Sequence, residues 1–385
     1  MLNALLLVGC IRSRAMLTRV YIDNFLCLVN FELELDETNV LLGSNGCGKT
    51  SVLRALSVLQ QLIARRARID EVMSTDDLTR WQSRNEQRFE INLTIQDNIY
   101  HYTLVVENDR DHRRMRIIKE LLTHNDHPIF DSKDSNAQLY HDDYTKGPMY
   151  RFDWSRSGVG GLDARHDNEK LTEFKRAIAR FIIVSPCPSL FQGEARNEDD
   201  FLDLHMKNFV SWYRHASQEN MGGILTLFED LRDTMPGFDS INLIESGENT
   251  RTMKVRFHGG DEDRKTIPFR LNEISDGQRL LVALYSLIHL SPSQALLFLD
   301  EPDNYLALRE VQPFLAKIDE QCGDTLAQAV ILSHHPVTID YMAGASGRWF
   351  YRDGGISPVR VRSEPEQEVI DGLSLSEMVG RGWER

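Results

Sequence analysis

The sequence predicts an α/β fold, and three short apolar runs carry this prediction. Each run is typical of a buried strand, and each is followed at once by glycine or polar residues. Because the carboxyl ends of parallel strands meet at one edge of a sheet, ligands of such folds bind there. The three runs are residues 40–42, 295–299 and 329–332.

The first run leads into a glycine-rich loop and then into a predicted helix. Residues 43–50 read GSNGCGKT, the complete G-x-x-x-x-G-K-[ST] phosphate-loop pattern, and residues 51–64 have apolar side chains at helical spacing. Glycines allow successive N–H groups to turn toward a phosphate, and the helix N-terminus adds the positive end of its dipole. We therefore expect these residues to bind nucleotide phosphates: Gly43, Ser44, Asn45, Gly46, Cys47, Gly48, Lys49, Thr50 and Ser51.

Two side chains of this loop have specific predicted roles. Lys49 would reach the β- and γ-phosphates of ATP, and the Thr50 hydroxyl would ligate the Mg²⁺ that bridges them. A chance glycine-rich turn is the alternative, but the strand before the loop and the helix after it both favour the motif. ATP and Mg²⁺ are therefore the expected ligands.

The composition is that of an ordinary soluble globular protein, since 41% of the 385 residues are hydrophobic and 26% are charged. The formal net charge of −14 argues against a surface built throughout to neutralise nucleic-acid phosphates, although a local basic groove is compatible with it. The five cysteines are scattered and form no C-x-x-C pair, which favours a reducing, cytoplasmic location. No segment is apolar for long enough to span a membrane, so we expect no membrane partner.

The first fifteen residues contain a short apolar run before Cys10. No basic residue precedes this run, and the run is shorter than the core of a signal peptide. We interpret residues 1–15 as an extension that is disordered or that precedes a start at Met16.

Residues 16–130 are expected to form an N-terminal lobe. Short strands lead into the phosphate loop, and three later segments alternate or are rich in branched and aromatic side chains, which predicts an antiparallel meander. These segments are residues 88–95, 99–106 and 113–122. The basic run at residues 65–68 is typical of a solvated helix end, with DNA contact as the alternative.

Residues 131–270 are expected to form an insertion and a helical lobe. Residues 125–168 are polar and dotted with glycine, which is compatible with a flexible insertion or a partner-facing loop. Asp261 and Asp263 in the later turn HGGDEDR could suggest a metal nuclease, but acidic and glycine residues are typical of a solvated hairpin tip. The predicted helices are residues 169–181, 198–215 and 220–235, and the predicted strands are residues 252–257 and 265–271.

Residues 271–362 hold three further motifs. Ser275 precedes an amphipathic helix and caps its N-terminus, which offers a second anion site. After the second apolar run, Asp300 can hold Mg²⁺ through water, and Glu301 can take a proton from an attacking water. His334 follows the third run and could sense the γ-phosphate. A metal site at the paired histidines is disfavoured, because neighbours on an extended chain point in opposite directions.

Four motifs together carry a resemblance to a known family. GSNGCGKT, SDGQ, LLFLDEP followed by DNYL, and LSHH resemble, in the same order, the Walker A, signature, Walker B, D-loop and switch-histidine elements of ABC-type ATPases. More narrowly, VYIDNF and NVLLGSNGCGKTSVLRAL are similar to head domains of the RecF, SMC and OLD group, including stand-alone AAA-family ATPases. The resemblance covers residues 16–352. It implies an α/β P-loop NTPase of ABC-ATPase head type, with a mixed central sheet, an antiparallel β subdomain and a helical lobe.

The resemblance implies an ATPase whose residues act in two groups. Within one head, Lys49 and Thr50 bind phosphate and Mg²⁺, Asp300 holds the metal, Glu301 is the general base and His334 completes the site. In a homodimer, two heads sandwich two ATP molecules, and the signature of each head reaches the γ-phosphate held by the other. The residues assigned to that second group are Ser275, Gly277 and Gln278, with Asp303 in the D-loop beside the interface. Gln192 is the candidate for the Q-loop glutamine near Mg²⁺.

A head of this kind would act as an ATP-gated clamp or regulator of DNA or of a separate effector protein, such as a nuclease or toxin. DNA repair and anti-phage defence are the expected settings. The nucleotide-binding subunit of an ABC transporter and a slow ATP-gated scaffold are the alternatives. The long segment between Lys49 and Ser275, and Asp276 in place of the usual glycine, argue against the transporter. Residues 363–385 are interpreted as a polar tail with one amphipathic stretch, and neither a Toprim domain nor a long coiled coil is expected.

Overall fold

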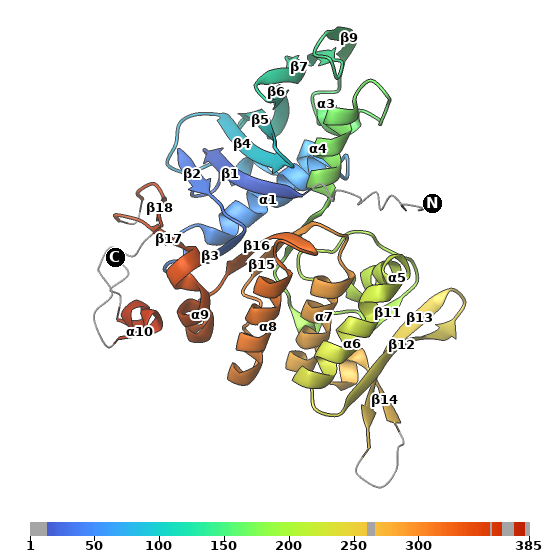
Figure 1. Ribbon diagram of the computed structural model, residues 1–385. Helices are drawn as coiled ribbons and strands as arrows, with labels where there is room; N and C mark the ends of the chain where they lie inside the picture. The colour runs from blue at the N-terminus through green and yellow to red at the C-terminus, as the bar shows by residue number, and fades with distance from the viewer. Residues whose placement is uncertain (1–13, 260–265, 355, 364–372, 382–385) are drawn as a thin grey trace, which may run out of the picture.

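A six-stranded sheet contains the three predicted apolar strands and lies at the centre of the molecule (Figure 1). This computed structural model describes residues 14–259, 266–354, 356–363 and 373–381. The first five strands in the order below run parallel, and the last is antiparallel to its neighbour. The strand order is β10 (Phe181–Val184), β15 (Ala295–Asp300), β16 (Leu326–Leu332), β3 (Thr38–Leu42), β17 (Gly347–Tyr351) and β18 (Arg360–Arg362).

Both faces of this sheet are covered, which explains why its central strands are apolar throughout rather than alternating. β15 and β16 are buried over their whole length. In β3, Leu41 belongs to the core on one face, whereas Val40 and Leu42 belong to the core on the other. Leu332 lies opposite both Leu41 and Asp300 in the strand pairing, so the ends of β3, β15 and β16 meet at one edge.

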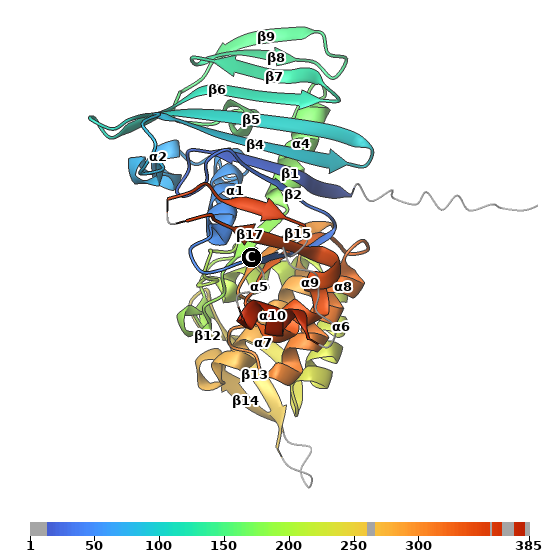
Figure 2. The same cartoon turned by 90° about the vertical axis from the view of Figure 1, so that its left-hand side faces the viewer.

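An eight-stranded antiparallel sheet forms the upper part of the molecule in Figures 1 and 2. The predicted meander forms its centre, but the sheet continues to Arg151, through residues that the sequence left open as an insertion or loop. Two-residue turns with positive φ values, Asn125–Asp126 and Asp134–Ser135, make the first two of the added hairpins, and residues 141–145 join the third. The lobe boundary expected at residue 130 falls inside one of these strands. The strand order is β2 (Phe31–Glu34), β1 (Ala15–Asp23), β4 (Glu86–Ile95), β5 (Asn98–Asp109), β6 (Arg114–His124), β7 (His127–Lys133), β8 (Asn136–Tyr140) and β9 (Lys146–Arg151).

Two helices lie between the sheets and share a core with both. α1 (Lys49–Ile63) is the helix predicted after the phosphate loop, and α4 (Glu169–Ala179) is the first helix predicted in the middle of the chain. Their apolar faces pack against the eight-stranded sheet and against one face of β15 and β16. The short helices near this layer are α2 (Ile69–Val72), η1 (Thr75–Asp77) and α3 (Gly158–Gly161).

The helical lobe covers the other face of the six-stranded sheet and forms the lower part of Figure 1. A small sheet of β11 (Glu194–Ala195), β12 (Phe238–Gly247), β13 (Thr250–His258) and β14 (Thr266–Arg270) packs beside it. Asp261 and Asp263 lie outside the described residues. The helices are η2 (Pro188–Leu190), α5 (Phe209–Glu219), α6 (Met221–Thr234), η3 (Leu271–Glu273), α7 (Asp276–Leu290), α8 (Leu308–Gln321) and α9 (Pro336–Ser346), with α10 (Leu375–Gly380) near the C-terminus.

One predicted helix is shorter than expected. The pattern over residues 198–215 predicts a helix throughout, but α5 begins only at Phe209. The Asn208 side chain accepts a hydrogen bond from the Asp203 N–H and donates one to the Phe201 carbonyl oxygen, so it holds the preceding residues in a loop. Within the described part of the chain, no helix has the length and apolar character needed to cross a membrane.

Candidate nucleotide-binding site

The phosphate loop follows β3, and its glycines adopt backbone angles that other residues rarely adopt. Gly43, Gly46 and Gly48 have φ values of 135°, 78° and 99°. Space also requires glycine at two of these positions. A Cβ at Gly43 would lie 2.2 Å from the Phe350 carbonyl oxygen, and one at Gly48 would lie 2.9 Å from the Cys27 sulfur. The glycine pattern in the sequence therefore reflects a loop geometry that larger residues would disrupt.

Lys49 is the first residue of α1, and its ammonium folds back onto the loop. The residue is 6% exposed, and Nζ donates hydrogen bonds to the carbonyl oxygens of Gly43, at 2.7 Å, and Ser44, at 3.5 Å. Gly48 at the N-cap provides no side-chain cap, so the helix presents its N-terminal N–H groups and the positive end of its dipole here. This combination of an ammonium and a helix N-terminus fits the phosphates of a nucleotide.

Two oxygen ligands suited to Mg²⁺ meet beside this loop. The Thr50 hydroxyl donates to Oδ2 of Asp300, the last residue of β15, at 3.4 Å. Burial raises the pKa of Asp300, whereas hydrogen bonds from Thr50 and Ser185 and the charge of Lys49 oppose that rise. Hydroxyl and carboxylate oxygens are ligands that Mg²⁺ prefers, so these two residues fit the ion that accompanies ATP.

Glu301 and His334 face each other beyond the ends of the neighbouring strands β15 and β16. His334 Nε2 lies 3.4 Å from Glu301 Oε1. Glu301 has a φ of 51°, which is uncommon for this residue type, and its N–H donates to the Leu332 carbonyl oxygen at 2.8 Å. Burial, followed by the charges of Asp303 and Asp300, raises the pKa of Glu301 to about 7. A carboxylate with a pKa near neutrality is well suited to accept a proton from water.

Asp303 is buried close to this pair. It is 1% exposed, and its Oδ2 accepts hydrogen bonds from the hydroxyls of both Ser333 and Thr338. Its Oδ1 has no hydrogen-bond partner among the described residues. The Ser333 hydroxyl in turn accepts from the His335 N–H at 2.9 Å. Asp303 therefore holds the loop that carries His334, and its expected place beside a dimer interface stays a prediction.

The signature residues form the N-terminus of α7, where Ser275 is exposed to solvent. The Ser275 hydroxyl accepts from the Gln278 N–H at 3.2 Å, and Gln278 Oε1 accepts from the Ser275 N–H at 3.1 Å. This reciprocal pair is a capping box, as the N-cap prediction required. A Cβ at Gly277 would lie 2.8 Å from the Tyr305 carbonyl oxygen, so glycine lets the helix pack closely on the segment after Glu301.

Exposed apolar side chains accompany the signature. Leu190, Tyr305 and Leu308 are 44%, 42% and 68% exposed. Arg279 of α7 donates to the Pro188 carbonyl oxygen at 3.4 Å, which ties the segment carrying Leu190 to the signature helix. Leu190 and Tyr305 are therefore exposed apolar side chains on segments that contact the signature helix.

The Q-loop prediction places Gln192 near Mg²⁺, but the structure brings a different residue to Asp300, the predicted metal ligand. The Gln192 side chain is exposed, and the backbone N–H of Gln192 donates to the Lys207 carbonyl oxygen at 2.9 Å. Ser185 directly follows β10 and hydrogen-bonds Asp300, while His205 Nδ1 lies 3.0 Å from the Ser185 carbonyl oxygen. Sequence reasoning missed both residues. The rule that found Asp300, a polar residue just after an apolar strand, would have found Ser185.

The basic run after α1 is neutralised by nearby acidic residues. Arg66 pairs with Asp163 and Arg68 with Asp70 at 3.0 Å, while the Arg65 guanidinium lies 4.3 Å from the centroid of an aromatic ring. These contacts favour the interpretation as a solvated helix end over DNA contact.

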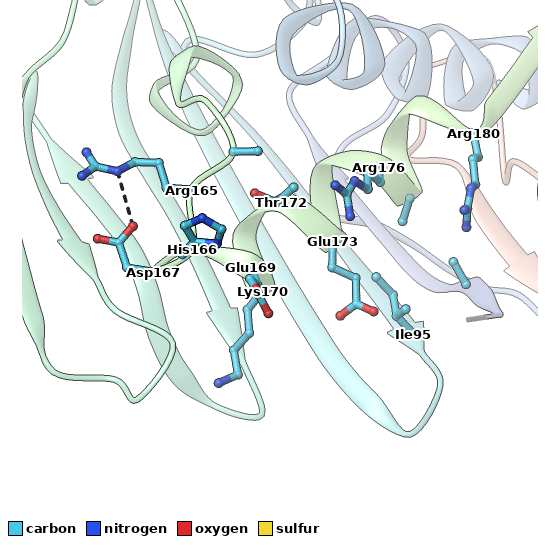
Figure 3. Close-up of a pocket in the computed structure, with 13 residues that line it drawn as sticks. Ile95, Arg165, His166, Asp167, Glu169, Lys170, Thr172, Glu173, Arg176 and Arg180 are labelled. Atoms are coloured by element: carbon cyan, nitrogen blue, oxygen red, sulfur yellow. Dashed lines mark ion pairs between the residues drawn. The ribbon is translucent and has the colours of Figure 1, made fainter. Parts of the chain in front are cut away.

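A cavity of about 1140 Å³ beside α4 is separate from the phosphate loop (Figure 3). Polar side chains of α4 and of the loop before it line the cavity, including the ion pair between Arg165 and Asp167 at 3.4 Å and the side chains of Arg176 and Arg180. None of the predicted nucleotide-binding residues lines this cavity. Cavity size alone therefore does not locate the nucleotide site.

The phosphate loop between β3 and α1, together with Asp300 at the end of β15 and Glu301 directly after it, defines the class of the protein by its fold as a P-loop NTPase of the ABC and SMC-head type. The chain belongs to the AAA domain family described as putative AbiEii toxin, Type IV TA system, whose model matches residues 38–340. The predicted fold class and family resemblance are thereby confirmed. No curated protein matches the chain.

Solved SMC heads have a similar fold. An Smc head bound to the C-winged helix domain of ScpA has a TM-score of 0.53 and 14% identity, covering 90% of this chain and 97% of that one. The SMC head domain from Thermotoga maritima has a TM-score of 0.44 and 13% identity, covering 89% and 97%. An Smc head with an extended coiled coil, bound to the C-terminal domain of ScpA derived from Pyrococcus furiosus, has a TM-score of 0.44 and 14% identity, covering 95% and 98%. At these identities the first similarity supports the fold alone.

Proposed function

We propose that this protein is a Mg²⁺-dependent ATPase that dimerises head to head around ATP and acts as a nucleotide-gated clamp or regulator. Each head would hold one ATP at its phosphate loop. Its signature would engage the ATP of the second copy. ATP binding would close the pair, and hydrolysis would open it.

One observation carries this proposal. The residues proposed for catalysis lie beside the phosphate loop of the same chain, whereas the signature residue Ser275 contacts none of them and faces solvent. Thr50 meets Asp300 at 3.4 Å, and His334 meets Glu301 at 3.4 Å, both beside the loop. Ser275 is exposed, and it caps α7 without meeting any of these residues in the described hydrogen bonds. An exposed anion-binding helix terminus with apolar neighbours suits a phosphate that a second copy supplies.

The residues of one head support water-mediated hydrolysis. Lys49 and the N-terminus of α1 would hold the β- and γ-phosphates, and Thr50 and Asp300 would hold Mg²⁺. When bound, Mg²⁺ supplies positive charge that offsets the charge of the phosphates. Glu301 would accept the proton of the attacking water, and His334 would help to orient that water and the γ-phosphate.

The partner that the clamp controls is proposed to be DNA or a separate effector protein, such as a nuclease or toxin. The family description names a putative toxin of a Type IV TA system, and two of the similar Smc heads are bound to ScpA domains. These relatives make a protein partner a reasonable expectation for this chain. Anti-phage defence and DNA repair are the settings we propose.

Hydrolysis by matched variants tests the proposed function. We expect Glu301→Gln to bind ATP normally and to lose on the order of 100-fold or more in turnover, because the amide cannot accept the proton. Glu229→Gln is a control at an exposed position of α6, and its turnover should match that of the unmodified protein. Full turnover in Glu301→Gln would remove Glu301 from the role of general base.

A further inference from the structure

Two arginines at the C-terminal end of α4 line the cavity beside that helix. Arg176 lies in the last turn of α4, and Arg180 directly follows the helix. Residues four positions apart lie on the same face of a helix, with Cβ atoms about 6 Å apart. Figure 3 shows both side chains together at one end of the cavity. The two guanidinium groups can therefore reach the same bound group.

Within the described part of the chain, neither guanidinium forms a hydrogen bond or an ion pair. Burial, followed by the charge of Arg176, lowers the pKa of Arg180, and the charge of Glu173 only partly offsets that change. The Glu173 carboxylate instead accepts a hydrogen bond from the Tyr100 hydroxyl at 2.6 Å. Two like charges therefore lie close together, one exposed and one half-buried, and no described side chain neutralises them.

The other acidic residues that line the cavity, Asp167 and Glu169, lie toward its opposite end. Asp167 precedes α4 and pairs with Arg165 at 3.4 Å, and Figure 3 shows this pair far from the two arginines. Glu169 is the first residue of α4. At a rise of 1.5 Å per residue, Glu169 lies about 10 Å along the helix from Arg176. The cavity therefore has a basic end at Arg176 and Arg180.

Basic residues in the last turn of a helix are expected even without a ligand, because they interact favourably with the negative end of the helix dipole. That interaction stabilises the helix and does not depend on a bound anion. Like charges four residues apart, however, repel each other. The partial removal of Arg180 from water adds a further cost to its charged form. An anion bound at this end of the cavity would offset both effects.

The chemistry of this end suits a phosphate group. A guanidinium presents its N–H donors in a planar fork that binds two phosphate oxygens at once, and two guanidinium groups match the double negative charge of a phosphate monoester. The cavity, at about 1140 Å³, also leaves room for a larger molecule that carries the phosphate. Buried apolar side chains line another part of the cavity and provide a surface for that molecule; these are Ala15, Ile95 and Ala177.

We propose that Arg176 and Arg180 bind the phosphate group of a second ligand, distinct from the nucleotide at the phosphate loop. The phosphate belongs either to a free small molecule or to a nucleic-acid strand, because both sources present the chemistry that the arginines recognise. None of the residues 43–51 lines this cavity, so the two sites are separate. The inference does not rest on the proposed function.

Titration calorimetry of the full chain carrying Lys49→Ala tests the site. The probes are inorganic pyrophosphate and a short single-stranded oligo-dT, both without Mg²⁺. Because Lys49→Ala weakens binding at the phosphate loop, the heat that remains reports on other sites. We expect at least one probe to bind this chain, and the added pair Arg176→Ala and Arg180→Ala to weaken that binding by about tenfold or more. Thermal midpoints without ligand show whether each variant is folded.

Two further pairs of variants separate charge from helix stability. Arg176→Lys with Arg180→Lys keeps both positive charges and should retain most of the binding, although lysine lacks the planar fork. Arg114→Ala with Arg232→Ala removes the same total charge from exposed positions on β6 and α6, and should leave both affinities unchanged. A loss that follows net charge alone would appear in this second pair as well.

Each outcome either supports the site or overturns it. Tight binding of pyrophosphate with weak binding of oligo-dT would support a free phosphorylated molecule, and the reverse would support a nucleic-acid strand. Absence of binding by both probes, or equal weakening by the two alanine pairs, would overturn the inference. A lower thermal midpoint with unchanged affinity in Arg176→Ala and Arg180→Ala would also overturn it, because the arginines would then serve only the helix. ATP binding by the unmodified chain tests the proposed function separately.

Discussion

Two regions of this molecule differ in how many of their expected partner residues lie in the same chain. We call them the phosphate-loop edge, which is the loop of residues 43–51 with Asp300, Glu301 and His334 beside it, and the signature edge, which is the N-terminus of α7 at Ser275. At the first, Lys49 lies against its own loop, Thr50 meets Asp300, and His334 meets Glu301, all within one chain. At the second, Ser275 caps its helix and faces solvent. The residues proposed for hydrolysis therefore meet within one chain, whereas the proposed contact of the signature needs a second copy.

The segment between Glu301 and α8 connects the two edges. Asp303 holds the loop before His334, and the Tyr305 carbonyl oxygen lies so close to the signature helix that only glycine fits at position 277. A contact at the signature can therefore reach the loop that carries His334 through the three residues from Asp303 to Tyr305. We therefore expect a change at the phosphate-loop edge to weaken ATP binding, and a change at the signature edge to weaken dimerisation without weakening ATP binding.

The largest effect is expected at the phosphate-loop edge. Lys49→Ala removes the ammonium that the phosphates need, so the affinity for ATP should fall on the order of 100-fold, as for the loss of charge-assisted hydrogen bonds. Lys133→Ala removes the same charge from an exposed position on β7 and should bind ATP normally. Titration calorimetry measures both variants. Unchanged affinity in Lys49→Ala would contradict the assignment of the loop.

A change at the signature edge should leave ATP binding intact and remove pairing. Ser275→Asp preserves the N-cap, because Asp and Ser cap helices about equally well, but it places a negative charge where the partner's γ-phosphate would approach. We expect the thermal midpoint to be retained and the ATP-dependent dimer to be lost, as measured by sedimentation. Ser275→Asn keeps the cap without the charge and separates the two effects. A dimer that persists in Ser275→Asp would place the pairing surface elsewhere.

The smallest effect is expected at the connection between the edges. The negative charge of Asp303 helps to raise the pKa of Glu301, so the neutral Asp303→Asn should lower that pKa. Glu301 must be ionised to accept a proton, and it would then be ionised at lower pH. The acid limb of the pH profile for ATP hydrolysis should therefore move to lower pH, by up to about one unit. Asp319→Asn, at an exposed position of α8, is the control. Movement of the acid limb to higher pH would contradict this account.

The sequence predicts the parts of the fold that depend on local pattern. The apolar runs that became β3, β15 and β16 are continuous because both faces of their sheet are buried. The strands added at residues 127–151 escaped prediction because their turns at Asn125–Asp126 and Asp134–Ser135 have backbone angles that composition does not reveal. The loop before α5 looked helical in pattern, but the hydrogen bonds of Asn208 override that pattern.

The candidate site shows the same limit. Lys49, Thr50, Asp300 and Glu301 are recognisable because each belongs to a short motif. The burial of Asp303 could not be predicted, because its partners Ser333 and Thr338 lie 30 and 35 residues away.

The most direct test of the central claim is the mass of Glu301→Gln in solution, measured by light scattering with and without MgATP. Loss of the general base should keep ATP intact, so the account predicts a monomer without nucleotide and a dimer with it. Adding Ser275→Asp to the same chain should return the mass to that of a monomer. A mass that ATP does not change, although calorimetry shows ATP bound, would contradict the account, because Ser275 would then not act on a second copy.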